Sequence, residues 1–429
     1  MFLLFCIFAI VKFLYMKKET KKKESSGQRE HKPNWKEYVA TIEDIERFLD
    51  ERVLLRRNVV TGLVEASPDW LPVSDFQLNS WWKELRRTKM VNLADFDHVV
   101  NSDYAPDYHP FQSYLEHLPP WNGDDYILGM SVSVTVKGGP DEQLMFYRFL
   151  RKWLVAMVAA WIDETVVNHE ILVLIGRQGA YKTTWFSYLL PPELRRYFRI
   201  KTNAGRMNKD DLLTLTRYGL VCCEELDTMN AAAMNQLKSA MTMPAVDERP
   251  VYGRHHEHRP HIASFCGTGN NTQFLNDPTG TRRWVPFEVE SIDSPRDHPF
   301  DYEGIYSQAY ALYNQGFEFW LSPAEAEWLM KHNSTFETPK SEIEMVNWYF
   351  RKPVDNEQGE FLPVSVAMQI IAANTAQIFT LEGLGRAFTK LGFQKKSNGD
   401  QRGYIVVRRS GAEIDERKHL LAISDDLQF

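Results

Sequence analysis

The sequence predicts an α/β fold with a mainly parallel sheet at its centre. Short apolar runs alternate with helical segments from about residue 168 to about residue 290, which is typical of such sheets. One run, "EILVLIG", leads into a glycine turn, a lysine and a helix. Another run, "YGLVCCEE", ends in two adjacent carboxylates.

Length and composition indicate a globular protein of several domains. The 429 residues are enough for about two or three domains. Apolar residues make up 44% and charged residues 25%, and the formal net charge is −7, so any contact with nucleic acid must come from local basic patches. The four cysteines form no C-x-x-C pair, so a reducing cytoplasm fits better than a disulfide or zinc framework.

The first fifteen residues are apolar and leave two interpretations open. The run is interrupted by Lys12 and is shorter than the roughly 20 residues of a membrane span. Either Met16 is the true start, or residues 1–15 are a membrane anchor. We favour a cytoplasmic protein with no stable membrane partner over an anchored one.

The whole chain divides into four predicted segments. Residues 1–34 are an apolar start and a disordered charged tail, and residues 35–140 form a helical N-terminal region. Residues 141–335 form the α/β core, beginning with a long buried helix. Residues 336–429 show a helix, a turn, a second helix and two strands around "SNGDQRG", which predicts a small winged-helix-like domain.

The stretch "EILVLIGRQGAYKTTWF" predicts a phosphate-binding loop between a strand at Ile171–Ile175 and a helix. Backbone N–H groups of such a loop cradle phosphates, a lysine adds a point charge, and the following hydroxyl binds Mg²⁺. Tyr181 stands where the usual spacing has glycine. The candidate ATP-binding residues are Gly176, Gln178, Gly179, Ala180, Tyr181, Lys182, Thr183 and Thr184.

Three later motifs supply the other groups that an ATPase needs. Glu224 and Glu225 end an apolar run, so one acid can hold Mg²⁺ while the other polarises the attacking water, and Asp227 is a possible third acid. Asn270 ends the run "IASFCGTGN" and is a candidate sensor of the γ-phosphate. Arg282 and Arg283 are candidates to neutralise charge in phosphoryl transfer, often from a neighbouring subunit.

These motifs, in this order, resemble the virulence-associated protein E family. The resemblance rests on G-R-Q-G-A-Y-K-T-T, C-C-E-E-L-D, R-P-x-Y-G-R, F-C-G-T-G-N and D-P-T-G-T-R-R-W, and it covers roughly residues 80–330. Members are P-loop ATPases related to superfamily 3 helicases from phage and mobile-element replication modules. The resemblance implies an AAA+/superfamily 3 helicase-like P-loop NTPase core.

The resemblance also implies the cofactors and roles of individual residues. ATP and Mg²⁺ are the expected cofactors, with Thr183 and Glu224 on the metal. Glu224 and Glu225 are the catalytic acids, and E-E-L-D can be aligned with either glutamate first. Asn270 is the implied sensor, and Arg282 and Arg283 have finger or sensor roles.

Three basic stretches stand out, at residues 195–206, 249–260 and 394–409, and the last two supply the candidate residues for nucleic-acid contact. The earlier of these two, "RPVYGRHHEHRP", lies in the interval where superfamily 3 relatives carry a DNA-gripping hairpin. The later one flanks the expected wing of the C-terminal domain. The candidate residues are Arg254, His255, His256, Lys395, Lys396 and Arg402. For the earlier stretch, the competing interpretation is that its arginines form ion pairs with nearby acids. For the later one, it is an ordinary basic hairpin at the surface.

The sequence therefore predicts a Mg²⁺-dependent, helicase-like ATPase that acts on DNA during replication of a phage or mobile element. Expected partners are single-stranded or forked DNA, a separate primase, and further copies of the chain in a homo-oligomeric ring. The alternative is a DNA-binding replication adaptor that binds ATP but hydrolyses it poorly.

Overall fold

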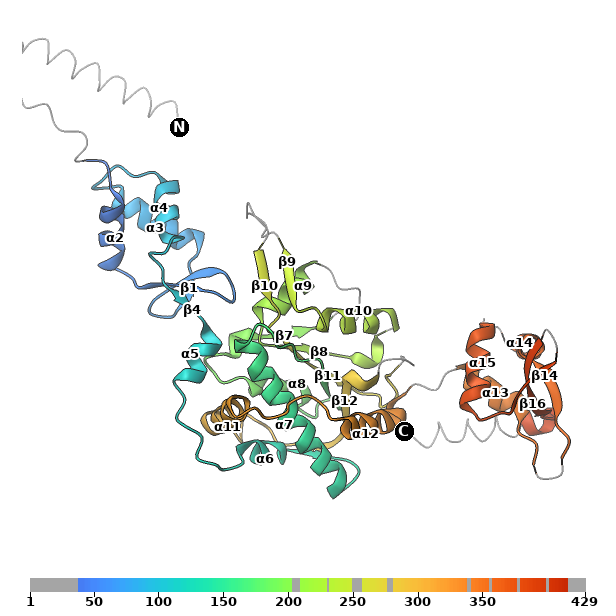
Figure 1. The fold of residues 1–429 in the computed structure, drawn as a ribbon. Helices are drawn as coiled ribbons and strands as arrows, with labels where there is room; N and C mark the ends of the chain where they lie inside the picture. Colours follow the sequence, from blue (N-terminus) through green and yellow to red (C-terminus); the bar gives the residue numbers. More distant parts are fainter. Residues whose placement is uncertain are drawn as a thin grey trace, which may run out of the picture. The chain divides into compact units, whose positions relative to one another are not determined.

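The computed structural model describes most of the chain after residue 37 (Figure 1). The described residues are 38–202, 209–229, 231–248, 257–275, 281–337, 341–354, 357–375, 379–398 and 401–415. They form two compact units, one ending at Pro110 and the other beginning at Phe111.

The first unit combines three helices with a small sheet. The helices are α2 (Ile42–Asp50), α3 (Asp75–Leu85) and α4 (Leu93–Val100). The strands β1 (Leu55–Asn58), β2 (Leu63–Ala66), β3 (Leu71–Pro72) and β4 (Asp107–Tyr108) form a sheet in the order β3-β2-β1-β4. Only helices were predicted here. The stretch "LRRN" forms β1 because antiparallel pairing with β2 overrides its local helical pattern.

The second unit contains a sheet of six strands, and this confirms the prediction of an α/β fold. The strands are β5 (Val134–Val136), β6 (Ile171–Ile175), β7 (Phe198–Lys201), β8 (Leu220–Cys223), β11 (Ser264–Gly269) and β12 (Trp284–Ile292). Their order is β5-β12-β6-β11-β8-β7. All neighbouring pairs are parallel except β5 with β12. The carboxyl ends of β6, β8 and β11 therefore meet at one edge.

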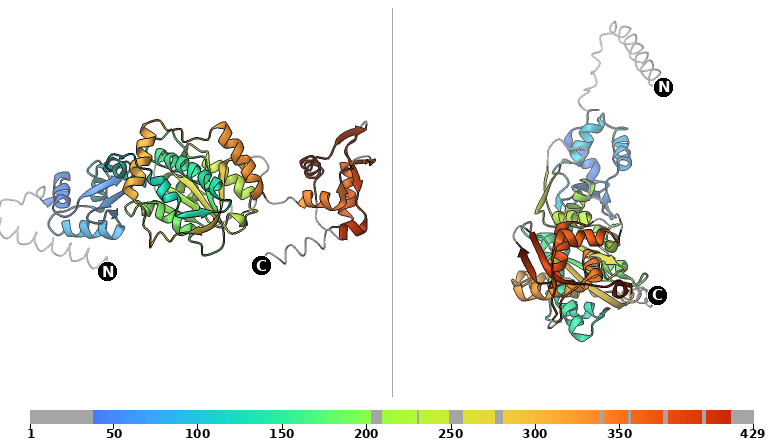
Figure 2. Two further views of the ribbon diagram at one scale, coloured as in Figure 1. Left: turned by 90° about the horizontal axis from the view of Figure 1, so that it is seen from below. Right: turned by 90° about the vertical axis from the view of Figure 1, so that its right-hand side faces the viewer.

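Helices cover both faces of this sheet (Figures 1 and 2). On one face, Ile171 and Val173 of β6 join a core with Met234 of α10 (Ala231–Met241). On the other face, Phe287 contacts Phe146 of α7 (Pro140–Ile162), with ring centroids 5.2 Å apart. Because successive side chains of a strand point to opposite faces and both faces are covered here, β6 and β8 are apolar and buried along their whole length.

Six further helices in the described part of the chain accompany the same sheet. They are α5 (Pro110–Glu116), α6 (Tyr126–Ser131), α8 (Lys182–Leu189), α9 (Lys209–Arg217), α11 (Tyr302–Asn314) and α12 (Pro323–Asn333). The sequence placed residues 35–140 in one helical region, but β5 pairs with β12 inside the central sheet. None of the helices in the described ranges is long and apolar enough to cross a membrane.

A separate small hydrophobic core organises residues 341–415. Its helices are α13 (Ser341–Tyr349), α14 (Val364–Ala372) and α15 (Leu381–Lys390). Its strands are β13 (Phe350–Arg351), β14 (Glu360–Pro363), β15 (Lys395–Asn398) and β16 (Gln401–Arg408), and β16 pairs with the other three. The predicted sequence of two helices and a hairpin is present. The winged-helix assignment stays a prediction.

Trp161 of α7 joins several elements beneath β8. Its ring stacks on Phe111 of α5 and Tyr306 of α11, at centroid distances of 4.6 and 5.7 Å. Its Nε1 donates a hydrogen bond to the carbonyl of Gly219, 3.0 Å away, just before β8 begins. A Cβ atom at Gly219 would lie 2.6 Å from Phe111 Cζ and 2.8 Å from Trp161 Nε1. The position has no room for a side chain.

We therefore expect Gly219→Ala to lower the free energy of unfolding by about 1–3 kcal/mol, because the methyl group overpacks two buried rings. Chemical denaturation checks this. Gly129→Ala on α6 is the matched control, since a Cβ there meets nothing within 4 Å. Equal stability of the two variants would contradict the packing described here.

Candidate nucleotide site at the carboxyl edge of the sheet

A tight loop connects β6 to α8 and forms one wall of the site. The N–H of Gly176 donates to the carbonyl of Gly269 on β11, 3.1 Å away, so the loop starts in register with the neighbouring strand. Gly179 has φ +79° and Tyr181 has φ +59°, and Tyr181 is the residue just before α8. The first N–H groups of a helix lack partners within it and carry partial positive charge. The loop and helix thus offer donors to an anion.

Lys182 is the first residue of α8, and its side chain folds back under the loop. It is only 7% exposed. Its Nζ donates to the carbonyls of Gly176 and Arg177 at 2.6 and 2.8 Å and to Asn270 Oδ1 at 3.3 Å. Burial lowers the pKa of Lys182, while the Asp227 carboxylate acts in the opposite direction. Three oxygen partners satisfy the three donors of the ammonium group.

The two predicted acids differ in their surroundings. Thr183 Oγ1 donates to Glu224 Oε1 at 2.8 Å, so the hydroxyl of α8 and the half-buried carboxylate after β8 are in direct contact. Glu225 is exposed and has φ +54°, in the left-handed region. This backbone bend turns the chain away from the strand direction immediately after Glu224. The structure therefore brings Glu224, rather than Glu225, to the threonine.

Asp227 holds the end of β11. Its carboxylate oxygens each lie 3.3 Å from a backbone nitrogen, one of Asn270 and one of Asn271. A Cβ at Gly269 would lie 2.8 Å from Ile175 Cδ1, so close packing requires a glycine there. Asp227 thus fixes the backbone that presents Asn270 to Lys182. The sequence offered Asp227 only as an additional acid, and its structural role was not predicted.

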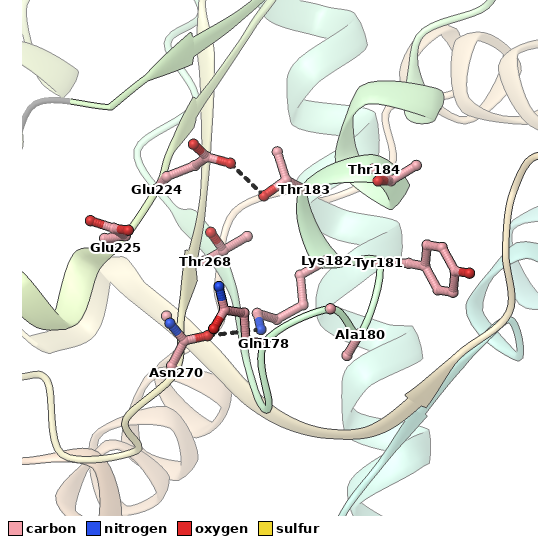
Figure 3. Close-up of a pocket in the computed structure, with 12 residues that line it drawn as sticks. Gln178, Ala180, Tyr181, Lys182, Thr183, Thr184, Glu224, Glu225, Thr268 and Asn270 are labelled. Carbon is pink, nitrogen blue, oxygen red and sulfur yellow. Dashed lines mark hydrogen bonds between the residues drawn. The ribbon is translucent and has the colours of Figure 1, made fainter.

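These residues enclose a cavity of about 250 Å³ (Figure 3). It is lined by Gln178, Gly179, Ala180, Tyr181, Lys182, Thr183, Thr184, Glu224, Glu225, Thr268, Gly269 and Asn270. Ten of the predicted residues line the cavity. An eleventh, Gly176, lies beside it, because its carbonyl accepts a hydrogen bond from Lys182. Thr268, which is 5% exposed, was missed. Its only signal was a hydroxyl within the run "SFCGTGN".

A second cavity of about 380 Å³ lies between α6 and the loop before α11. Its polar lining includes Asp124, Asp125, Asp293 and Asp301, and none of the lysines and arginines that the structure describes lines it. A surface of this charge repels phosphate. The smaller cavity, with a buried lysine at a helix N-terminus, is the one suited to an anion.

Comparison with known proteins adds a family to this geometry. The sequence model of the virulence-associated protein E-like domain matches residues 118–338, about half of the chain. The chain belongs to this family. The matched residues contain every residue that lines the Lys182 cavity. No curated protein sequence matches the chain.

Three solved apo structures of the NrS-1 C-terminal region are similar to this chain. Their sequence identities are 11%, 12% and 11%, and their TM-scores are 0.46, 0.47 and 0.49. In each case the match covers 85% of this chain and 98% of the other. Similarity at this level does not extend to function.

Arg282 and Arg283 lie at the opposite edge of the sheet of this virulence-associated protein E-like domain. They end the 3-10 helix η4 (Thr281–Arg283), and the next residue, Trp284, pairs with Ile171 at the start of β6. The strand from Ile171 to Ile175 spans about 13 Å. Arg283 Nη1 lies 3.5 Å from the carbonyl of Lys238 on α10. Neither arginine lines the Lys182 cavity.

Arg283 instead lowers the pKa values of two neighbouring side chains at this amino-terminal edge, Glu170 and His169. Burial raises the pKa of Glu170 to about 7, and Lys152 and Arg283 both oppose that rise. Burial also lowers the pKa of His169, and the charge of Arg283 lowers it further. Arg282 is exposed and Arg283 half-buried. The structure thus separates the two arginines from the other predicted catalytic residues of the same chain.

The candidates for nucleic-acid contact fall in two places. Arg254, His255 and His256 lie outside the described residues, between the paired strands β9 (Ala245–Glu248) and β10 (Glu257–Pro260). Lys395, Lys396 and Arg402 are exposed on the β15–β16 hairpin, beyond the family match. Arg402 pairs with Ser397, so Lys395 and Arg402 share one face of the hairpin and Lys396 lies on the other.

The chain alone offers few metal ligands. Within the described ranges, no group of three or more His, Cys, Asp or Glu side chains could hold a metal ion. The Thr183–Glu224 pair supplies two oxygen ligands of the kind that Mg²⁺ prefers when substrate phosphates complete its shell. The pair therefore fits a metal that arrives with a phosphate ligand.

The left-handed backbone of Tyr181 predicts a gain in stability from Tyr181→Gly. A non-glycine residue in the left-handed region destabilises the folded state by about 1–2 kcal/mol. Replacing it with glycine removes this cost, but glycine loses more conformational entropy on folding, which takes back about 0.5–1 kcal/mol. We expect the variant to be more stable by about 0.5–1 kcal/mol in chemical denaturation. Ala180→Gly, next to it and without positive φ, should lose stability. If Tyr181→Gly lost as much stability as Ala180→Gly, the backbone of Tyr181 would not be strained.

Proposed function

We propose that this protein is a Mg²⁺-dependent ATPase with a P-loop NTPase core, which acts on DNA in a helicase-like manner during replication of a phage or mobile element. The observation that carries the proposal is the buried Lys182 ammonium at the N-terminus of α8, beside the Thr183–Glu224 pair. Family membership and the order of the motifs support the replication setting.

The cavity can bind a triphosphate through the loop and Lys182. The N-terminus of α8 and the preceding turn supply N–H donors and partial positive charge. Lys182 already contacts Asn270 at 3.3 Å, its longest hydrogen bond, and a phosphate oxygen can replace this contact without disturbing the two backbone carbonyls. The lowered pKa of Lys182 reflects a desolvated ammonium, and such a charge attracts an anion strongly.

Thr183 and Glu224 would hold Mg²⁺, which neutralises phosphate charge when bound. Glu225 adjoins them, lines the cavity and is exposed, so it is placed to polarise a water molecule. Asn270 reaches Lys182 and can contact the terminal phosphate or its attacking water. Asp227 would keep that asparagine in position through the backbone of β11.

The position of the two arginines favours a ring or other head-to-tail oligomer. A group that neutralises transition-state charge must reach the γ-phosphate. Arg282 and Arg283 lie at the amino-terminal edge of their own sheet, opposite the cavity, so we propose that they contact the nucleotide bound by a neighbouring copy. Heterologous interfaces of this kind generate rings when the rotation closes.

Contact with single-stranded or forked DNA is proposed from local charge. Lys395 and Arg402 lie on one face of the C-terminal hairpin, which we assign as the wing of a winged-helix-like domain. The β9–β10 strands would carry the second contact at Arg254, His255 and His256. A separate primase is the expected protein partner.

Lys182→Ala should reduce steady-state ATP turnover to background, with and without single-stranded DNA, because the loop loses its point charge. Phosphate release measures this. Lys331→Ala on α12, an exposed lysine of the same unit, is the control and should retain wild-type turnover. Undiminished turnover of the Lys182 variant would refute the site. A wild-type protein that binds ATP but shows no turnover under either condition would favour the replication adaptor.

Arg283→Ala should lower kcat by on the order of 10³-fold and change ATP affinity little, since a finger acts on the transition state. Mixing this variant with Lys182→Ala tests action between subunits. When the two variants mix randomly in equal amounts, about a quarter of the interfaces join a subunit with an intact Lys182 to a neighbour with an intact Arg283. About a quarter of the wild-type turnover should therefore return. Mixed oligomers without any recovery would contradict the proposal.

A further inference from the structure

Tyr181 retains an unfavourable backbone conformation at the edge of the site. Its φ and ψ are +59° and 10°, and it directly precedes Lys182. Strain of this kind persists where the surrounding structure or a function maintains it. Glycine would adopt the same turn at lower cost. The side chain of Tyr181 therefore needs an explanation beyond the shape of the loop.

The ring of Tyr181 is free to contact a ligand. The residue is 46% exposed. Its ring and hydroxyl make no hydrogen bond or aromatic contact with any described residue, and the residue's carbonyl accepts the N–H of Trp185 at 2.7 Å. Tyr181 nevertheless lines the Lys182 cavity, and its ring lies on the side of Lys182 away from Glu224 and Glu225 (Figure 3). With 46% of the residue exposed, the ring stands at the edge of the site and outside the buried core.

The shape of the site places a nucleoside on the side of this ring. Glu224 and Glu225 lie on one side of Lys182, and Tyr181 and Thr184 on the other (Figure 3). The metal and the terminal phosphate belong at the carboxylate side. At about 250 Å³ the cavity is smaller than the roughly 300–1,000 Å³ of sites that enclose a whole small molecule. It suits the phosphate chain, so the base must lie at the mouth.

We propose that Tyr181 stacks on the base of the bound nucleoside triphosphate and thereby raises affinity without selecting one base over another. The inference rests on the proposed function, since it assumes that phosphates occupy the Lys182 cavity. Every base has a π-face, so stacking tolerates different bases. The site should accept ATP and GTP with affinities within a few-fold of each other, and both should bind more tightly than inorganic tripolyphosphate.

Two substitutions separate the ring from the backbone. Tyr181→Phe keeps the ring and removes the hydroxyl. Tyr181→Asn removes the ring but keeps a residue that tolerates the left-handed conformation, so the loop should keep its geometry. Circular dichroism and thermal melting check that both variants fold.

Calorimetric titration of the full chain with ATP, GTP and tripolyphosphate, each with Mg²⁺, tests the proposal. We expect Tyr181→Phe to bind all three ligands like the wild type. Tyr181→Asn should lose about tenfold in affinity for ATP and GTP, within the range measured for base stacking on aromatic residues, and nothing for tripolyphosphate.

Three results would overturn the stacking role. They are an equal loss for ATP and tripolyphosphate, no loss for either ligand, or a strong preference of the wild type for one base. If the wild type bound neither ATP nor tripolyphosphate, or if Lys182→Ala left tripolyphosphate binding intact, the proposed function itself would fail and the inference with it.

Discussion

The buried ammonium group of Lys182 is the constraint on which the site depends. Removing such a charge from water costs several kcal/mol unless oxygen partners replace the lost hydration. Two backbone carbonyls of the loop and the amide of Asn270 provide these partners. They come from the β6–α8 loop and from the end of β11. Satisfying one cation therefore fixes the loop, the helix and the neighbouring strand relative to one another.

The parallel sheet determines which groups can work together within one chain. Because β6, β8 and β11 run the same way, the residues after each strand meet at one edge. Lys182, Glu224 and Asn270 come together for this reason, although they are widely separated in sequence. The same geometry places Arg283 at the other edge, beside Glu170. This position is the reason why we propose that the arginines act on the site of a second copy of the chain.

Much of the fold and the site could be predicted because the signals were local. The apolar run Ile171–Ile175 forms β6 with the predicted bounds, and residues that follow β6, β8 and β11 line one cavity. The sheet of the first unit was missed because β1 is formed through pairing with β2, which its own residues do not show. Non-local contacts explain the other gaps. Asp227 looked like a third acid, and only the folded chain shows it bound to the backbone of Asn270.

Hydrogen–deuterium exchange with and without Mg·ATP tests the central claim, that the Lys182 cavity is the nucleotide site. We expect slower exchange in peptides that cover residues 176–189, 220–228 and 264–271, because the ligand orders the loop and the two strand ends. Peptides that line the acidic cavity, at residues 124–133 and 298–305, should exchange unchanged. Protection of the acidic cavity, or none at the Lys182 loop under saturating ATP, would contradict this claim.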